Sequence, residues 1–401
     1  MKSILEIPAS LVLCIATLAG AQDEPAPEPN VKLRSSLMVI DDATLYSALH
    51  PSLPTGSSQV LKDPTVNLVQ NQILVEPSFT LRYRDRWSLS SSAVGVAQSF
   101  RGLAPSEFNP PAGQPAVTAE LAAALNPYTG AHEFLRVKEA YAGLSAGDFD
   151  FSVGRRIVRW GTGYAFTPAG VLDPPRNPTN PTDRLSVNEG RDMVKADFVH
   201  GSQAVQVAYS SAVLEKAQMQ AHDTAALRYN TMVHGFDTCL IAGDDRGGDA
   251  FGGMTFTRVL GQAWELHGEG IWREQAAVLL GAKYTTASGV TYIGEFYTPP
   301  NTGYYRGTTL QPLSGRPHYA FFDVGKSRLR ELPGWKEWDL SASLVANLDD
   351  RSSTVIFDAT RRFGNHFSAY LHLEAPLGSR TSEYGATPYK GATSIGMRFQ
   401  L

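Results

Sequence analysis

The sequence predicts an all-β protein, folded as a single transmembrane antiparallel β-barrel of about sixteen strands, within a range of about 14–18. Three observations lead to this fold class. Segments of about ten residues alternate apolar and polar side chains along most of the chain. Short connections alternate with long ones, and the N-terminus has the pattern of an export signal. Apolar residues make up 43% of the chain, which excludes wholesale disorder, yet no stretch of about 20 of them could form a membrane helix.

Residues 1–21 have the features of a secretory signal peptide. Lys2 supplies a positive start, an apolar run follows over 7–18, and small residues favour cleavage after Ala21. The acidic, proline-rich sequence that comes next argues against the alternative, a buried N-terminal helix. Removal of the signal leaves Cys239 as the single cysteine, so we expect neither a disulfide nor a thiol metal site.

The remainder of the chain divides into two parts. Residues 22–65 are rich in proline and form either an N-terminal segment or a partial first strand, which the pattern places at 32–40. Residues 66–401 carry the regular alternation and are predicted to form the barrel.

The strands are predicted from a period of two in hydrophobicity. In 366–375, Phe367 and Leu371 lie on one face of the predicted strand, and His372 and Glu374 lie on the other. The predicted strands are 66–83, 86–99, 133–145, 148–160, 191–200, 203–213, 226–236, 250–260, 262–274, 276–287, 289–298, 318–326, 336–348, 353–363, 366–376 and 391–401. The one convincing helical pattern, 117–126, lies in a long connection.

Aromatic residues gather near the predicted strand ends, as in the girdles of a membrane barrel. Trp264 and Trp272 lie at the two ends of one face of a single strand. Trp87, Trp160, Tyr229, Tyr284 and Trp335 follow the same trend. Such girdles favour a lipid-facing band over the inner face of a soluble sandwich.

The connections between strands predict which end of the barrel faces outward. Tight links at 146–147, 288–289 and 364–365 suit periplasmic turns. Long links rich in proline and glycine suit extracellular loops, and they cover 101–131, 161–190, 300–317 and 377–390. An open sheet leaves backbone groups unpaired in lipid, so the sheet must close into a barrel.

The C-terminal segment, 391–401, ends the chain inside a strand. Ile395, Met397, Phe399 and Leu401 share one face of it. Phe399 and Leu401 are therefore predicted to form the membrane-insertion signal that the barrel-insertion machinery reads.

Charged residues are concentrated between 133 and 192. Arg156 shares its phase with polar residues and is placed in the lumen, because an arginine facing lipid costs roughly 2–4 kcal/mol. Arg155 falls on the apolar phase, so a bulge near Gly154 or a strand end is expected there. Glu139 is ambiguous for the same reason, since apolar residues share its phase.

Several short motifs in 133–200 resemble a family of porin-like outer-membrane barrels related to alginate-export and hydrophobic-compound transport channels. The matching pieces are Glu139-Ala140-Tyr141, Gly147-Asp148-Phe149-Asp150-Phe151, Gly154-Arg155-Arg156, Val158-Arg159-Trp160-Gly161 and Leu172-Asp173-Pro174. The resemblance implies a hairpin followed by a loop that reaches into or over the pore, and passive passage of a solute. Four prolines between 174 and 181 make this loop stiffer than is usual in the family.

We therefore predict a charged lumenal constriction built around 133–192. The candidate pore-lining residues are Glu139, Arg156, Arg159, Trp160, Asp173, Arg176, Asp183, Arg191 and Asp192. These side chains could select solutes by charge and size, or they could form a salt-bridge lattice that braces the wall and the loop. The two roles are compatible.

No catalytic motif is found, so we expect neither an enzyme nor a bound cofactor or metal. A net charge of −4 gives no support to nucleic-acid binding. The sequence predicts a channel in the outer membrane of a Gram-negative-type bacterium, with lipid, the insertion machinery and a small solute as partners. The alternatives are a closed structural or assembly barrel, and an exported soluble β-protein that binds a ligand or polysaccharide.

Overall fold

The computed structural model describes most of the predicted barrel. The described residues are 31–49, 66–101, 130–174, 176–180, 185, 188–211, 223–245, 250–273, 275–299, 318–329, 334–379, 382–385, 387 and 389–401. The predicted signal peptide, the predicted helix at 117–126, and Asp183 lie outside them.

The described part of the chain forms eighteen strands and no helix. Their bounds are β1 Val31–Leu49, β2 Val66–Tyr83, β3 Trp87–Arg101, β4 Gly130–Ala146, β5 Phe149–Arg156, β6 Arg191–His200, β7 Gln203–Ser210, β8 Thr224–Val233, β9 Phe236–Asp245, β10 Ala250–Leu260, β11 Trp264–Trp272, β12 Ala276–Thr285, β13 Val290–Thr298, β14 Tyr319–Ser327, β15 Trp338–Asn347, β16 Ser352–Phe363, β17 Phe367–Leu377 and β18 Gly391–Gln400.

The structure has eighteen strands rather than about sixteen, at the upper end of the predicted range. The strand β9 was missed because it shows no period of two. Its inner face buries Cys239 and Ile241, so both faces are apolar at mid-strand. The first strand, β1, runs well beyond the predicted 32–40 and pairs with β2 along most of its length. Residues 31–49 thus belong to the barrel wall.

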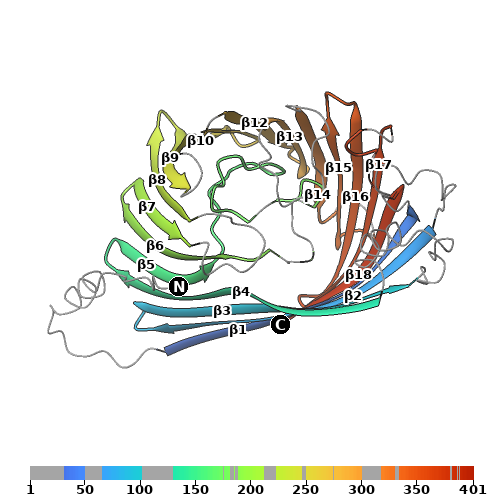
Figure 1. The fold of residues 1–401 in the computed structure, drawn as a ribbon, viewed down its shortest axis with the longest axis horizontal. Helices are drawn as coiled ribbons and strands as arrows, with labels where there is room; N and C mark the ends of the chain where they lie inside the picture. Colours follow the sequence, from blue (N-terminus) through green and yellow to red (C-terminus); the bar gives the residue numbers. More distant parts are fainter. Residues whose placement is uncertain are drawn as a thin grey trace, which may run out of the picture.

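The sheet closes into a single barrel (Figure 1). Each strand pairs antiparallel with the next one in the chain, and β18 pairs with β1 from Met38↔Gln400 to Ser47↔Gly391. The links at the end where β18 terminates include the tight turns 147–148 and 234–235, and the links at the other end include 157–190 and 378–390. Closure removes both sheet edges, as a barrel in lipid requires.

Large apolar side chains cover the outer face of the wall. On β11, Trp264 and Trp272 are 49% and 62% exposed, while His267 and Glu269 between them face inward and are buried. On β18, Ile395, Met397 and Phe399 are exposed on the outside. No helix of the described residues is long and apolar enough to cross a membrane. The exposed apolar and buried polar side chains that alternate along β11 give the inside-out pattern of a barrel set in lipid.

A register shift in β4 reverses the faces of that strand. It lies where β3 pairs with β4 between Ser92 and Ala93, and Lys138 is the extra residue between Val137 and Glu139. Val137 is exposed outside, whereas Lys138 is buried inside. A bulge of this kind places Glu139 on the inner face, although its phase in the sequence matches that of Leu135 and Val137.

Candidate functional site: the inward loop and its anchors

The segment 157–190, here called the inward loop, follows β5, and its described residues lie inside the ring of strands (Figure 1). Its apolar side chains Trp160, Phe166 and Leu172 are almost fully buried. The Phe166 ring stacks on Tyr297 of β13 with centroids 4.8 Å apart and lies 5.7 Å from Tyr319 of β14. Apolar burial thus fixes the loop against the wall opposite its own strands.

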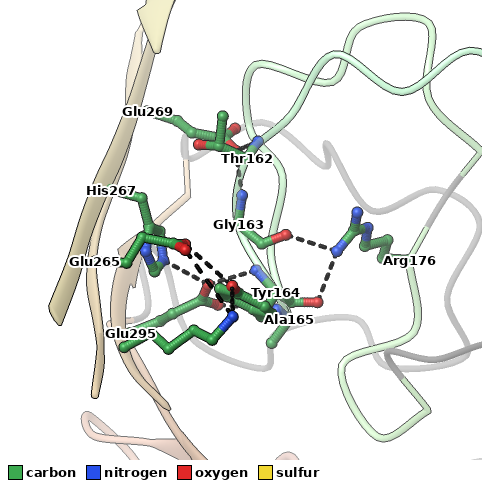
Figure 2. A network of polar contacts seen from close by, with 10 residues as sticks. Thr162, Gly163, Tyr164, Ala165, Arg176, Glu265, His267, Glu269 and Glu295 are labelled. Atoms are coloured by element: carbon green, nitrogen blue, oxygen red, sulfur yellow. Dashed lines mark hydrogen bonds and ion pairs between the residues drawn. The ribbon is translucent and has the colours of Figure 1, made fainter. Parts of the chain in front are cut away.

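Glu269 of β11 is the first polar anchor of the inward loop (Figure 2). One of its carboxylate oxygens accepts hydrogen bonds from the backbone N–H groups of Thr162 and Gly163, the latter at 2.6 Å. The other oxygen accepts from the N–H of Ala169 at 2.9 Å. These hydrogen bonds from main-chain N–H groups offset the free-energy cost of burying the carboxylate.

Glu295 of β13 is the second anchor. It accepts hydrogen bonds from the N–H groups of Tyr164 and Ala165, the latter at 2.9 Å. The Nε2 atom of His267 lies 3.0 Å from Glu295 Oε1, and both side chains are fully buried. Two neighbouring carboxylates therefore hold one turn of the loop.

The loop is also braced from within. Arg176 donates hydrogen bonds to the carbonyl oxygens of Gly163 and Tyr164 at 2.6 and 2.8 Å, from the side opposite the wall carboxylates (Figure 2). Asp173 accepts from the N–H groups of Trp160 and Gly161 at 2.6 and 3.2 Å. Burial raises the pKa of the Asp173 carboxyl, and these N–H groups oppose that effect.

Replacing Asp173 by Asn should lower the free energy of unfolding in detergent by about 1–3 kcal/mol. Asn keeps one acceptor oxygen, but its NH2 group turns toward an N–H donor in a buried position. Thermal or urea unfolding measures the loss. Asp148→Asn, in an exposed turn, is the matched control and should stay within about 0.5 kcal/mol of wild type. Equal losses in the two variants would contradict the bracing role.

Tyr164, in the inward loop, contacts the wall at a point nearer to the short-turn end of the barrel than Glu269. Its hydroxyl donates to Glu265 of β11 at 3.0 Å and accepts from Lys283 of β12 at 3.0 Å. Burial raises the pKa of the Tyr164 hydroxyl. All three side chains are partly exposed, so this polar cluster faces the remaining lumen.

A second loop enters the same end of the barrel. In 378–390, Glu383 accepts hydrogen bonds from Tyr319 of β14 at 2.8 Å and from Asn347 of β15 at 2.6 Å. Burial raises the pKa of Glu383, and the neighbouring Tyr384 is buried against the same core as the inward loop. Both loops therefore rest on Tyr319.

Three of the predicted arginines lie where β5 and β6 meet the inward loop. Arg156 donates to Ser152 at 3.0 Å and stacks over the Tyr141 ring on the inner face. Arg191 is its cross-strand neighbour on β6. Arg159 is exposed, and among the described residues it makes no hydrogen bond or ion pair. Glu139, also inside, accepts from the N–H of Ile157 at 2.9 Å.

Arg155 and Asp192 lie on the other side of the wall. They are cross-strand neighbours that form a two-point ion pair at 3.0 and 2.8 Å. Their phases match those of Val153 and Val194, which are exposed on the outer face. No register shift interrupts β5 beside Gly154, whose φ of 124° is positive. Asp192 thus neutralises Arg155 outside, and the candidate Asp192 does not line the lumen.

The structure separates the predicted residues into distinct groups. Arg156, Arg191 and Glu139 lie together on the inner wall, and Trp160, Asp173 and Arg176 stabilise the loop. Prediction from sequence missed the wall residues His267, Glu269 and Glu295. Glu265, His267 and Glu269 fall on the strand face opposite Trp264 and Trp272, which is consistent with an inward position. Nothing in the sequence pairs them with residues about a hundred positions away.

No family model and no curated protein matches this chain. Solved structures do match its fold. The chain is similar to OpdQ of Pseudomonas aeruginosa, at 6% identity and a TM-score of 0.58 over 92% of this chain and 99% of that one. It is similar to OccK9 (OpdG) of the same organism, at 8% identity and 0.58 over 92% and 98%. The outer membrane protein opdK, also from Pseudomonas aeruginosa, matches at 9% identity and 0.56 over 92% and 98%. At these identities the likeness establishes a shared barrel fold.

Proposed function

We propose that this protein is a porin-like channel for the passive passage of small solutes across the outer membrane of a Gram-negative-type bacterium. The observation that carries the proposal is a closed barrel with an apolar outer belt and a charged loop held inside it. The similarity in fold to an outer membrane protein supports the location. Long loops then face outward, short turns face the periplasm, and Phe399 and Leu401 form the insertion signal.

The charge selectivity is assigned to the inner arginines where the inward loop leaves β5. Arg156 and Arg191 bring two positive charges to this side of the lumen, and Glu139 lies on the same inner face. We place the exposed Arg159, at the start of the inward loop, beside them. Arg176 and Asp173 brace the loop instead, since both are occupied by loop backbone groups. Different residues among the predicted pore-lining candidates thus select solutes by charge and stabilise the inward loop.

Replacing Arg156 and Arg159 together by alanine should shift the ion selectivity toward cations, because two positive charges leave the lumen. The measurement is the reversal potential of single channels in a salt gradient. Arg155→Ala is the control, since this arginine is paired with Asp192 outside and with Glu189 at 3.8 Å, so its loss should alter stability without altering selectivity. Unchanged selectivity with a lower melting temperature in the double variant would assign these arginines to bracing.

A closed structural or assembly barrel is the second candidate function. The specific observation in its favour is the extensive packing of the inward loop and of 378–390 inside the same end of the barrel. A barrel that inserts into a planar bilayer without conducting would favour this candidate. Heat-modifiable migration on a detergent gel distinguishes both membrane barrels, the open channel and the closed structural barrel, from an exported soluble protein.

The relation to alginate-export and hydrophobic-compound channels is also a proposal. It rests on the motifs of 133–200, where the hairpin β4–β5 and the inward loop occupy the positions that the resemblance implies. We propose no catalytic role for the barrel.

A further inference from the structure

We infer that Glu269 and Glu295 are the positioning residues of the pore: they set its aperture by holding the inward loop against β11 and β13. This inference rests on the proposed channel function and deepens it. Neither residue lies in the charged region 133–192 that the sequence singles out. Their role follows from where their oxygens lie.

The two carboxylates are committed to the loop. In the described part of the chain, Glu269 bonds to the N–H groups of Thr162, Gly163 and Ala169, and to the Thr162 hydroxyl at 3.2 Å. Glu295 bonds to two further N–H groups and to His267. Neither carboxylate forms an ion pair with Lys or Arg among these residues. Two buried carboxylates that together accept hydrogen bonds from five main-chain N–H donors, three at Glu269 and two at Glu295, are suited to holding a backbone in place.

The anchored turn lies across the lumen from the strands that carry the loop. The loop leaves β5 and returns to β6, whereas its anchors are on β11 and β13 of an eighteen-strand ring. Holding the turn there also fixes Tyr164, whose hydroxyl meets Glu265 and Lys283 at the lumen. If the turn detaches, this cluster comes apart and the loop no longer narrows the passage.

The turn leaves little freedom for alternative packing. A Cβ on Gly163 would lie 1.9 Å from the Phe166 carbonyl oxygen, so any side chain there is incompatible with the anchored turn. Gly163→Val therefore disrupts the same contact from the loop side. Variants on the two sides should produce the same open state, and their effects should not add.

The test compares Glu269→Gln with Glu295→Gln, singly and together, in the chain from Gln22 to Leu401. Gln has nearly the shape of Glu but turns an NH2 group toward backbone N–H donors. We expect the double variant to conduct at least about twofold more per channel and to admit larger uncharged sugars in liposome swelling, because the passage widens. Gly163→Val should reproduce this change and add little to it.

Asp323→Asn is the matched control. Asp323 is another inward carboxylate, on the adjacent β14, and its hydrogen-bond partner is Ser343 of the wall at 2.6 Å rather than the loop. The Asp323→Asn variant removes one inward carboxylate charge, as each single Gln variant does, but it leaves the contacts of the loop intact. The sugar cut-off of this variant should therefore stay at the wild-type value. Heat-modifiable migration confirms that each variant has folded.

Each outcome decides a separate point. An unchanged sugar cut-off in a folded Glu269→Gln, Glu295→Gln barrel overturns the inference while leaving the channel function intact. A fully additive effect of Gly163→Val also overturns it. A silent wild type beside a conducting double variant contradicts the open-channel function but supports the anchors as the closing element. If both are silent, both proposals fail.

Discussion

Replacing Lys138 by Met should lower the free energy of unfolding by about 3–5 kcal/mol, because it leaves a buried carboxylate unpaired. Lys138 Nζ lies 2.9 Å from both oxygens of Glu76, and both side chains are largely buried. The pair links β2 to the bulge of β4. Urea unfolding in detergent, followed by tryptophan fluorescence, measures the loss.

The double variant Lys138→Met with Glu76→Leu separates the cost of an unpaired charge from the value of the pair. With both charges removed, most of the lost stability should return, since apolar replacements of buried ion pairs are often neutral. A double variant as unstable as the single one would show that the lysine acts through packing or through contacts other than Glu76.

Replacing Gly154 by Val should prevent the barrel from refolding. Gly154 has a φ of 124°, which L side chains rarely adopt, and a Cβ there would lie 2.2 Å from the carbonyl oxygen of Ala140. The neighbouring β4 backbone cannot move away without breaking the ladder between β4 and β5. The fraction of heat-modifiable protein after refolding measures the effect.

Gly294 of β13 provides the comparison for this substitution. A Cβ at Gly294 meets no atom within 4 Å, and the residue has no positive φ. Gly294→Val should therefore refold like wild type. Normal refolding of Gly154→Val would mean that the strand can relax at this position, and that the positive φ is not required.

The fold could be predicted because the strands of a membrane barrel alternate apolar and polar residues, and this alternation is visible in the sequence. Strands such as β17 and β18 place apolar residues outside and polar residues inside, so their period of two is clear. The alternation is lost where the inner face of a strand packs against apolar side chains instead of facing water. β9 buries Cys239 and Ile241 against the core that the inward loop completes, and this strand was missed.

The candidate site was less predictable than the wall. The loop that reaches into the pore was expected from the motifs near Leu172-Asp173-Pro174, and local contacts such as Asp173 with Trp160 lie close in sequence. The anchors Glu269 and Glu295 bind residues from the other side of the barrel. A single sequence holds no signal that pairs them. The position of Arg155 could not be predicted for a simpler reason. Its charge is neutralised by Asp192, and the two residues become neighbours only when β5 pairs with β6.

Single-channel recording from the refolded chain, starting at Gln22, tests the proposed function most directly. We expect discrete conductance steps in a planar bilayer, with a reversal potential displaced from zero in a salt gradient because the lumen carries fixed charge. The displacement should change when Arg156 and Arg159 are removed. Barrels that insert but never conduct would contradict a passive channel, and they would make the loop-closed structural barrel the better account.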